Sequence, residues 1–169
     1  FKVKGFVYSS SSSVYGEVNE QVAIGEATET KPISMYGLQK LQAEQLVTMY
    51  SQLYGLPTVS LRYFNVYGTK RQSPDGPYAN VMSSFIRDFK NKGKVTIFGS
   101  GLQQRDFVHV YDVVEANFRA AKIAKKHKGI VMNIGTSKAT SINEVSAIFN
   151  YPVVYGPGRK EDPLYSCAN

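Results

Sequence analysis

Apolar residues along the chain alternate between short continuous runs and longer stretches with helical spacing. Short continuous runs are typical of strands that are buried on both faces, and helical spacing indicates helices that cover such strands. The pattern therefore predicts an α/β domain. The expected strands are residues 3–9, 58–63, 94–98, 106–110 and 130–134.

Turn and cap residues place the predicted helices between these strands. A helix is expected over residues 36–54, because Gly55 and Pro57 end the helical spacing there. The apolar face of this helix is expected to consist of Ala43, Leu46, Val47, Tyr50, Leu53 and Tyr54. The other helices are expected from Val81 to Gly93, from Asp112 to Gly129 and from Ser141 onward, with Asp112–Glu115 and Ser141–Glu144 as capping boxes.

The composition is that of a globular protein, and it narrows the choice of partners. The 169 residues are 43% hydrophobic and 20% charged, which suits one domain of ordinary size. No apolar run approaches the roughly 20 residues of a membrane span, and no secretory signal is recognisable, so no membrane partner is expected. The net charge of +7 is spread along the chain, and its densest group, residues 122–128, falls at an expected helix end. We therefore expect no nucleic-acid partner.

Cys167 is the single cysteine of the chain. An intrachain disulfide and a cysteine zinc site are therefore excluded, no metal site is expected, and a cytoplasmic location is predicted. We expect Cys167 to be a packing residue, and likewise His109, which lies in an alternating strand pattern.

The most specific local pattern is YGLQK at residues 36–40. A spacing of four residues puts Tyr36 and Lys40 on the same face of a helix. A free tyrosine, with a pKa of about 10, is a poor base at neutral pH, but a neighbouring ammonium favours the phenolate and lowers the pKa. Such a pair can move a proton to or from a substrate hydroxyl. By itself the pattern also occurs by chance on many helices.

A run of serines precedes this helix. It follows the predicted strand 3–9, about 25 residues before Tyr36, so that Ser11, Ser12 or Ser13 could bond the same substrate oxygen. A strand, a serine loop and then a Tyr-x-x-x-Lys helix is the order of the active site in the short-chain dehydrogenase/reductases.

Longer motifs in the same order make this resemblance specific. The segments are FVYSSSSSVYG at residues 6–16, SMYGLQK at 34–40, LRYFNVYG at 61–68, VTIFGSGLQQRDFVHVYDV at 95–113, MNIG at 132–135 and SINEV at 141–145. Together they resemble the extended short-chain dehydrogenase/reductases, and among them the nucleotide-sugar epimerases of the UDP-glucose 4-epimerase type. The resemblance extends over nearly the whole chain.

The resemblance implies the C-terminal part of a Rossmann-like doubly wound parallel sheet plus a small α/β substrate-binding lobe. Residues 1–68 would be the second half of the NAD-binding domain. Residues 69–169 would be mainly the nucleotide-sugar-binding lobe, with strand 106–110 and helix 112–128 returning to the first part. The glycine-rich phosphate loop of the family is absent from this sequence. We therefore expect that the chain alone neither retains NAD nor epimerises sugars, and that it forms a homo-oligomer or pairs with a complementing N-terminal fragment.

The resemblance also implies an activity, the NAD-dependent epimerisation of a UDP-sugar or another NDP-sugar at C4 through a 4-keto intermediate. Tyr36 would take the proton of the 4-hydroxyl, Lys40 would hold the nicotinamide ribose, and Ser11 would be the catalytic serine. Ser12 and Ser13 stand where the 4,6-dehydratases have Asp and Glu. Because the elimination of water needs those carboxylates, the two serines argue against a dehydratase.

Other positions match the binding residues of the family. An arginine fork pairs well with phosphate oxygens, which suits the two arginines among them. The matched positions are Asn65, Arg105 and Arg159 at the diphosphate, Val81 and Phe98 at the nucleobase, Ser12 and Ser13 at the sugar, and Tyr63, with Tyr36 and Lys40, at the nicotinamide. Two alternatives stay open. One is another NDP-sugar dehydratase or decarboxylase of the family, and the other is a non-catalytic chain that binds a nucleotide sugar or self-associates.

Overall fold

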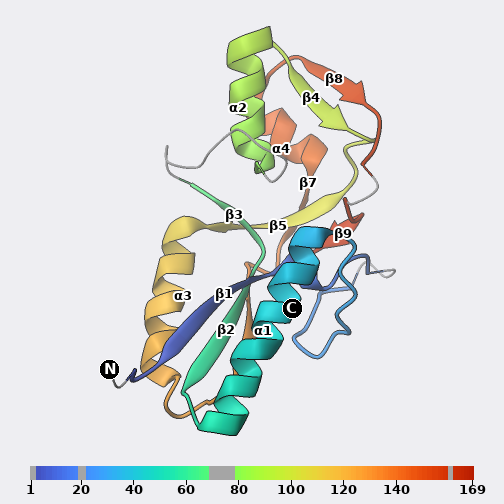
Figure 1. Cartoon of the computed structure of the whole chain (residues 1–169). Helices are drawn as coiled ribbons and strands as arrows, with labels where there is room; N and C mark the ends of the chain where they lie inside the picture. The colour runs from blue at the N-terminus through green and yellow to red at the C-terminus, as the bar shows by residue number, and fades with distance from the viewer. Residues whose placement is uncertain (1–2, 19–21, 69–78, 160–161) are drawn as a thin grey trace.

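Three groups of elements follow one another in space, as Figure 1 shows. A parallel sheet lies between two long helices, a second sheet crosses the middle of the molecule, and a small lobe of two helices and a strand pair lies at the far end. The computed structural model describes residues 3–18, 22–68, 79–159 and 162–169. The alternation of strands and helices confirms the predicted α/β class.

The parallel sheet consists of β1 (Phe6–Ser11), β2 (Thr58–Tyr63) and β6 (Ile130–Ile134), in that order. In the register, Phe6 lies opposite Thr58, and Val59 lies opposite Ile130. Parallel neighbours need crossover connections, which run here through α1 (Met35–Tyr54) and α3 (Val110–Ile123).

Helices α1 and α3 cover opposite faces of this sheet (Figure 1). Side chains alternate between the two faces along a strand. Val59 and Leu61 of β2 pack in one apolar cluster with Ala120 of α3. Arg62, on the other face of β2, pairs with Glu44 of α1. The strand is thus covered on both sides, as its continuous apolar run predicts.

The predicted apolar face of α1 does not face the core. Leu46 and Leu53 are 59% and 66% exposed, whereas the buried side of the helix carries Gly37, Glu44 and Ser51. Helical spacing locates an apolar face but does not show what covers it. The sheet presents polar groups on this side, and α1 meets them with small and polar residues.

The second sheet crosses the molecule between the two ends. Its strands are β3 (Asn65–Tyr67), β5 (Gln104–His109), β7 (Ala139–Ser141) and β9 (Tyr165–Ser166). Strands β3 and β9 run parallel to β5, and β7 runs antiparallel to it. Of these strands the sequence predicted only β5.

A fully buried carboxylate joins this sheet to the first one. Asp106 of β5 accepts hydrogen bonds from the backbone N–H groups of Thr136, Ser137 and Ala168. Backbone donors of this kind satisfy a buried charge without a cation. Asp106 thereby ties β5 to the turn after β6 and to the C-terminal segment.

The small lobe has its own apolar core. It contains α2 (Val81–Lys92), β4 (Val95–Phe98), α4 (Ile142–Phe149) and β8 (Val153–Gly156), with β4 and β8 parallel. Phe85 of α2, Val95 and Ile97 of β4, and Ile142 and Val145 of α4 form the centre of the cluster.

Three helix boundaries that were predicted from the sequence are confirmed: the C-termini of α1 and α2 and the N-terminus of α4. Gly55 and Gly93 adopt the left-handed conformation that ends α1 and α2. At the start of α4, Ser141 and Glu144 form a complete capping box, with Ser141 Oγ accepting from the Glu144 N–H.

The predicted start of α3 is wrong. The helix begins at Val110, and its N-cap is His109, whose Nδ1 accepts the N–H of Tyr111 at 3.3 Å. Glu115 pairs with Arg119 instead of capping the helix. His109 is therefore half-buried and caps the helix, instead of packing in the core as predicted. Its ring has the capping role that was expected of the Asp112 carboxylate.

Cys167 is a buried packing residue, as predicted. Burial raises the pKa of the Cys167 thiol above its ordinary value. Among the described residues, no helix is long and apolar enough to cross a membrane. The division of the chain at residue 68 stays a prediction, because it falls at the edge of residues 69–78, which lie outside the described part.

Candidate active site

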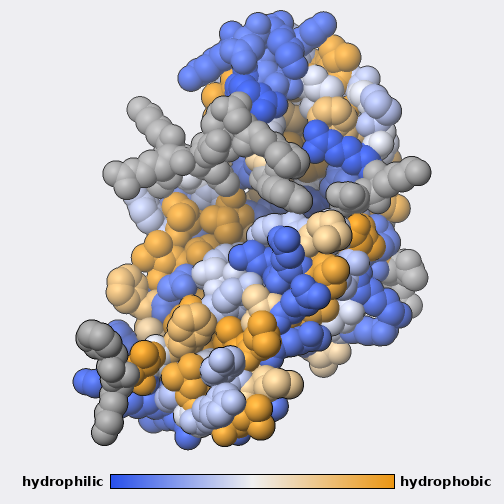
Figure 2. Space-filling view, viewed as in Figure 1, coloured by the Kyte–Doolittle hydropathy of each residue, from blue (hydrophilic) through white to orange (hydrophobic). Residues whose placement is uncertain are grey.

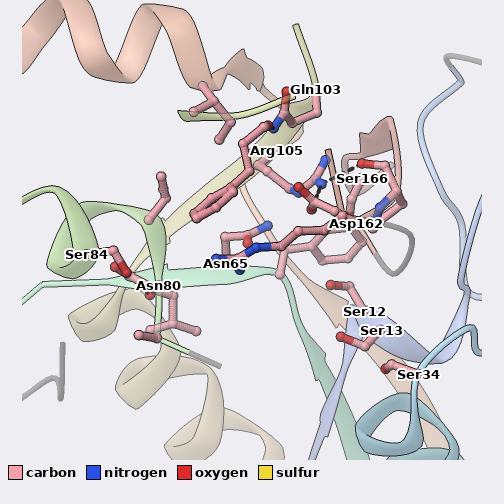
Figure 3. Close-up of a pocket in the computed structure, with 18 of the residues that line it drawn as sticks. Ser12, Ser13, Ser34, Asn65, Asn80, Ser84, Gln103, Arg105, Asp162 and Ser166 are labelled. Carbon is pink, nitrogen blue, oxygen red and sulfur yellow. Dashed lines mark hydrogen bonds and ion pairs between the residues drawn. The ribbon is translucent and has the colours of Figure 1, made fainter. Parts of the chain in front are cut away.

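A cleft of ≈1020 Å³ lies between the parallel sheet and the small lobe. The ends of β1 and β2 contribute to its lining, together with the first turn of α1, helix α2 from its first to its last turn, strands β3 to β5 and the segment before β9 (Figure 3). Ligands of α/β proteins bind at the carboxyl ends of parallel strands, which is where this cleft opens. Its volume suits a ligand of nucleotide size.

The serines after β1 form one wall of the cleft. Ser11 ends β1, and its Oγ accepts the N–H of Ser13 at 3.2 Å, which starts the short 3-10 helix η1 (Ser12–Val14). The same Oγ donates to Ser13 Oγ at 3.1 Å. Ser11, Ser12 and Ser13 all line the cleft. The loop is thus held by its own hydroxyl groups.

Tyr36 lies in the first turn of α1 and lines the same cleft as these serines. Lys40 follows one turn later. Its Nζ donates to the Ser9 carbonyl at 2.8 Å and lies 5.7 Å from the ring centroid of Tyr36. An ammonium has three N–H donors, so the bond to Ser9 leaves Lys40 able to bind a hydroxyl-bearing ligand. The expected pair is therefore on one helix face, and Tyr36 lines the same cavity as the serine wall.

Tyr8 lies beside this pair, and Tyr63 lies at the cleft. The ring centroid of Tyr8 lies 5.4 Å from Lys40 Nζ. Burial, then the neighbouring Tyr36 and Glu44, raise the pKa of Tyr8, which keeps its proton in place. Tyr63, expected beside the nicotinamide, lines the cleft, and its hydroxyl donates to Asn117 Oδ1 of α3 at 2.9 Å.

Arg105 lines the cleft from β5, opposite the serines, and its position is fixed by protein groups. It is 7% exposed and donates from Nη2 to Asp162 Oδ1 and to the Pro163 carbonyl, and from Nη1 to the Gln104 carbonyl. No local pattern in the sequence indicated this ion pair. A phosphate that binds Arg105 must share or displace the carboxylate of Asp162.

The remaining predicted anchors reach the cleft from separate elements. Asn65 comes from β3, Val81 from the start of α2 and Phe98 from the end of β4. The guanidinium carbon of Arg159 lies 3.9 Å from the ring centroid of Phe98, as a cation–π pair. Arg159 is itself exposed, so its guanidinium faces both the ring and the solvent.

Other polar residues line the cleft and were missed in the sequence. Two of them form hydrogen bonds to backbone carbonyls of other lining residues. Asn80 Nδ2 donates to the Val66 carbonyl at 2.8 Å, and Gln103 Nε2 donates to the Phe98 carbonyl at 2.8 Å. The position of Asn80 directly before the apolar run of α2 is a helix-cap signal that could have located it. The missed residues, labelled in Figure 3, are Ser34, Asn80, Ser84, Gln103, Asp162 and Ser166.

A buried polar network lies beneath the serine wall. Glu44 accepts from Ser10 Oγ at 2.7 Å and from Arg62 Nη2 at 2.6 Å. Arg62 Nη1 donates to the hydroxyl of Tyr15 at 2.7 Å, and that hydroxyl donates to Asn133 Oδ1 at 2.7 Å. Burial acts to lower the pKa of Arg62, but the hydrogen bonds and charge interactions with Glu44 and Tyr15 together outweigh it, so the pKa is raised. The network joins α1, β1, β2 and β6.

Most of the chain matches one protein family. Residues 1–135 match the model of the NAD dependent epimerase/dehydratase family. The chain belongs to this family. Its structural neighbours have the same Rossmann-like architecture.

The similar proteins act on nucleotide sugars. UDP-glucose 4-epimerase of Lactobacillus helveticus is 32% identical over 180 residues, which cover 95% of this chain and 54% of the relative. UDP-N-acetylglucosamine 4-epimerase from Methanobrevibacter ruminantium M1, solved with UDP-N-acetylmuramic acid, is 34% identical with a TM-score of 0.87 over 99% of this chain and 54% of its own. UDP-glucuronic acid 4-epimerase from Bacillus cereus, solved with UDP-glucuronic acid and NAD, is 31% identical with a TM-score of 0.88 over 100% of this chain and 54% of its own.

The chain spans about half the length of the relatives it matches. The family also holds other activities at similar identity. A UDP-N-acetyl-alpha-D-glucosaminuronate decarboxylase of Bacillus cytotoxicus is 35% identical over 147 residues, and a trifunctional UDP-glucose 4,6-dehydratase of Arabidopsis thaliana is 34% identical over 147 residues. Family membership therefore places the chain among the NAD-dependent epimerases and dehydratases, and it does not select one reaction.

Proposed function

We propose that this chain carries the proton-transfer and sugar-nucleotide-binding part of an NAD-dependent 4-epimerase of a UDP-sugar. The observation that carries the proposal is the composition of the cleft. Tyr36 and the serines Ser11 to Ser13 line one side of it, and Asn65 and Arg105 line it from the second sheet. A group that moves a proton and groups that bind phosphate are thus available to a single ligand.

In this proposal Tyr36 takes the proton of the sugar 4-hydroxyl. Ser11 turns its hydroxyl hydrogen from Ser13 Oγ to the same oxygen, and Lys40 stabilises the phenolate and binds the ribose next to the reacting ring. NAD, when bound, supplies the acceptor and later the donor of the hydride at C4. The sugar is protonated again at the 4-oxygen by Tyr36, which returns the site to its initial state.

The residues at this end of the cleft fit the nicotinamide half of the dinucleotide. The fit rests on the side chains present: the ammonium of Lys40 keeps N–H groups beyond its bond to Ser9, and Tyr36 lines the cleft. The ammonium donates to ribose hydroxyls, and the Tyr36 oxygen can accept from one. The ring of Tyr63, in the wall next to them, offers an apolar surface for a nicotinamide.

The carboxylates of the cleft argue for epimerisation rather than elimination. Positions 12 and 13 carry hydroxyl groups. Among the described lining residues the carboxylates are Asp88 and Asp162, and each is engaged in an ion pair, with Arg87 and with Arg105. Removal of water needs a free acid and a free base at the sugar, and neither carboxylate meets that need.

Product analysis tests the proposal. The protein that carries this chain is incubated with NAD and, in separate reactions, with UDP-glucose, UDP-N-acetylglucosamine and UDP-glucuronic acid, and the products are identified by NMR. A 4-epimer from any of them supports the proposal. A 4-keto-6-deoxy sugar, or a pentose with release of carbon dioxide, would replace it by dehydration or decarboxylation.

A face of α1 further supports self-association. Leu46, Met49, Tyr50, Leu53 and Tyr54 are each more than half exposed, and Figure 2 shows hydrophobic residues at the surface over α1. Exposed apolar patches on a helix are typical of interaction sites. We include a homo-oligomer in the proposed function on this ground.

A further inference from the structure

Gly37 lies where the backbone of α1 comes closest to the serine loop. A Cβ at this position would lie 2.4 Å from the Ser13 carbonyl oxygen and 3.1 Å from the Pro32 Cβ. A side-chain carbon does not approach a backbone oxygen this closely, so only glycine fits with the helix and the loop where they are. The backbone of Gly37 is helical, so the requirement is one of space and not of conformation.

Local helix preference works against this residue. Glycine is less favourable than alanine inside a helix. The first turn is already held from its start, because the Gly37 N–H donates to Ser34 Oγ at 3.0 Å. Helix formation therefore favours alanine here, and the contact with the serine loop is the reason for glycine.

The contact connects the two sides of the reacting centre. Tyr36 directly precedes Gly37, and the Ser13 carbonyl that faces Gly37 belongs to the loop whose Ser13 N–H binds Ser11 Oγ. Lys40 is on the same helix as Tyr36 and moves with it. A methyl group at position 37 would therefore change the spacing between Tyr36 and Ser11 and leave the Tyr36–Lys40 spacing unchanged.

We propose that Gly37 is a positioning residue that sets the distance between the Tyr36 and Ser11 hydroxyls, so that both reach one substrate oxygen. The inference rests on the proposed function. Both groups must come within about 2.6–3.2 Å of that oxygen, and a displacement of about 1 Å costs about 10²-fold in rate. The anchors Asn65 and Arg105 lie on other elements, so the binding of the diphosphate is independent of position 37.

The test is Gly37→Ala in the protein that carries this chain, with Gly25→Ala as the matched control. At Gly25 the nearest atom to an added Cβ is 3.8 Å away, and its φ is not in the left-handed region. We expect Gly37→Ala to lower kcat about 10–100-fold, with KM for the sugar nucleotide and the bound NAD, measured by absorbance, unchanged. Gly25→Ala should match the wild type. An unchanged kcat for Gly37→Ala, or a variant that does not fold, would overturn the proposal.

A double variant separates positioning from a general loss of structure. If Gly37→Ala acts by displacing Ser11, then Ser11→Ala should cost far less in the Gly37→Ala background than in the wild type, because the serine no longer reaches the substrate. Additive losses would contradict the inference.

Failure of the proposed function gives a different result. If the wild-type protein turns over none of the UDP-sugars, the proposed function is wrong. A crystal structure of Gly37→Ala then measures the position of the serine loop directly. A serine loop that has moved away from Tyr36 upholds the spacing role, and an unmoved loop overturns it.

Discussion

The carboxylate of Glu44 and the guanidinium of Arg62 form a two-point ion pair beneath the cleft, with both side chains nearly inaccessible to solvent. Arg62 donates from Nε at 3.0 Å and from Nη2 at 2.6 Å to the two oxygens of Glu44. The side chain of Arg62 is 7% exposed and that of Glu44 is 5% exposed. Glu44 lies two turns after Tyr36 on α1, so the pair anchors the helix that bears Tyr36 and Lys40 to the sheet.

Glu44→Ala is expected to destabilise the chain strongly, because it leaves Arg62 buried without its partner. The loss is about 3–5 kcal/mol, the usual effect of breaking a buried pair, and urea unfolding followed by circular dichroism measures it. The control is Glu115→Ala, which breaks the exposed pair with Arg119 on α3 and should leave the unfolding midpoint almost unchanged. Equal midpoints for the two variants would show that Glu44 contributes no more than a surface carboxylate.

Arg105 is expected to bind the diphosphate of the ligand, and Asp162 to compete for it. Arg105→Ala should weaken UDP binding by about 1.5–3 kcal/mol, the range for a hydrogen bond to a charged group. Asp162→Asn should strengthen it, because the variant removes the negative charge that now holds the guanidinium. Isothermal titration calorimetry with UDP measures both, with Arg119→Ala, a surface arginine of α3, as the control. UDP affinity that does not respond to either substitution would place the diphosphate elsewhere.

Tyr36→Phe is expected to remove proton transfer and to keep substrate binding. Turnover of the UDP-sugar should fall by about 10²–10⁴-fold, the contribution of a positioned acid or base, with little change in KM. Tyr50→Phe, at an exposed site on the same helix, is the matched control and should leave turnover unchanged. Near-normal turnover in Tyr36→Phe would remove Tyr36 from the mechanism.

The folded chain brings residues predicted for the site to one cleft, and their roles stay predictions. Residues such as Tyr36, Ser11 and Arg105 belong to ordered motifs, and the folded chain brings them to one cleft. Asp162 was missed as the partner of Arg105, since the two lie 57 positions apart and no local pattern links them. The Glu44–Arg62 pair was missed for the same reason.

The elements were predicted where local signals agree with tertiary contacts. The run Thr58–Tyr63 is a strand covered on both sides, as continuous apolar residues indicate. The short strands β3, β7 and β9 have too few residues to show a period, and they form because β5 offers them backbone partners. The apolar face of α1 was recognised, but its exposure depends on what the sheet presents to the helix.

Alkaline pH is expected to destabilise the chain. Burial raises the pKa of Cys167, and burial, against the opposing hydrogen bond of Arg62, raises the pKa of Tyr15. Both groups are neutral when protonated, so the folded state holds its protons where the unfolded chain loses them, at pKa values of about 8.5 and 10. The stabilisation is complete below those values and is lost as pH rises through them toward the folded pKa. Urea midpoints measured between about pH 7 and pH 10.5 should therefore fall.

Cys167→Ala separates the two groups in that experiment. In this variant the fall of the urea midpoint that begins near the thiol pKa of about 8.5 should be absent. The later fall, near the tyrosine pKa of about 10, should remain. An identical pH profile in the variant and the wild type would contradict the assignment to Cys167.

Self-association through α1 is the last expected property. Leu46, Leu53 and Tyr54 are 59%, 66% and 72% exposed, and fully burying a leucine contributes about 1.5–3 kcal/mol. A second copy of the chain that covers this face would bury several such side chains at once. Sedimentation velocity should show a mass above the monomer that grows with concentration, and Leu53→Lys should return the chain to the monomer. Gln52→Lys, at an exposed polar position of the same helix, adds the same charge and should leave the association intact. A wild-type chain that stays monomeric at every concentration, or one that Gln52→Lys and Leu53→Lys affect equally, would show that this apolar face is not an interface between copies.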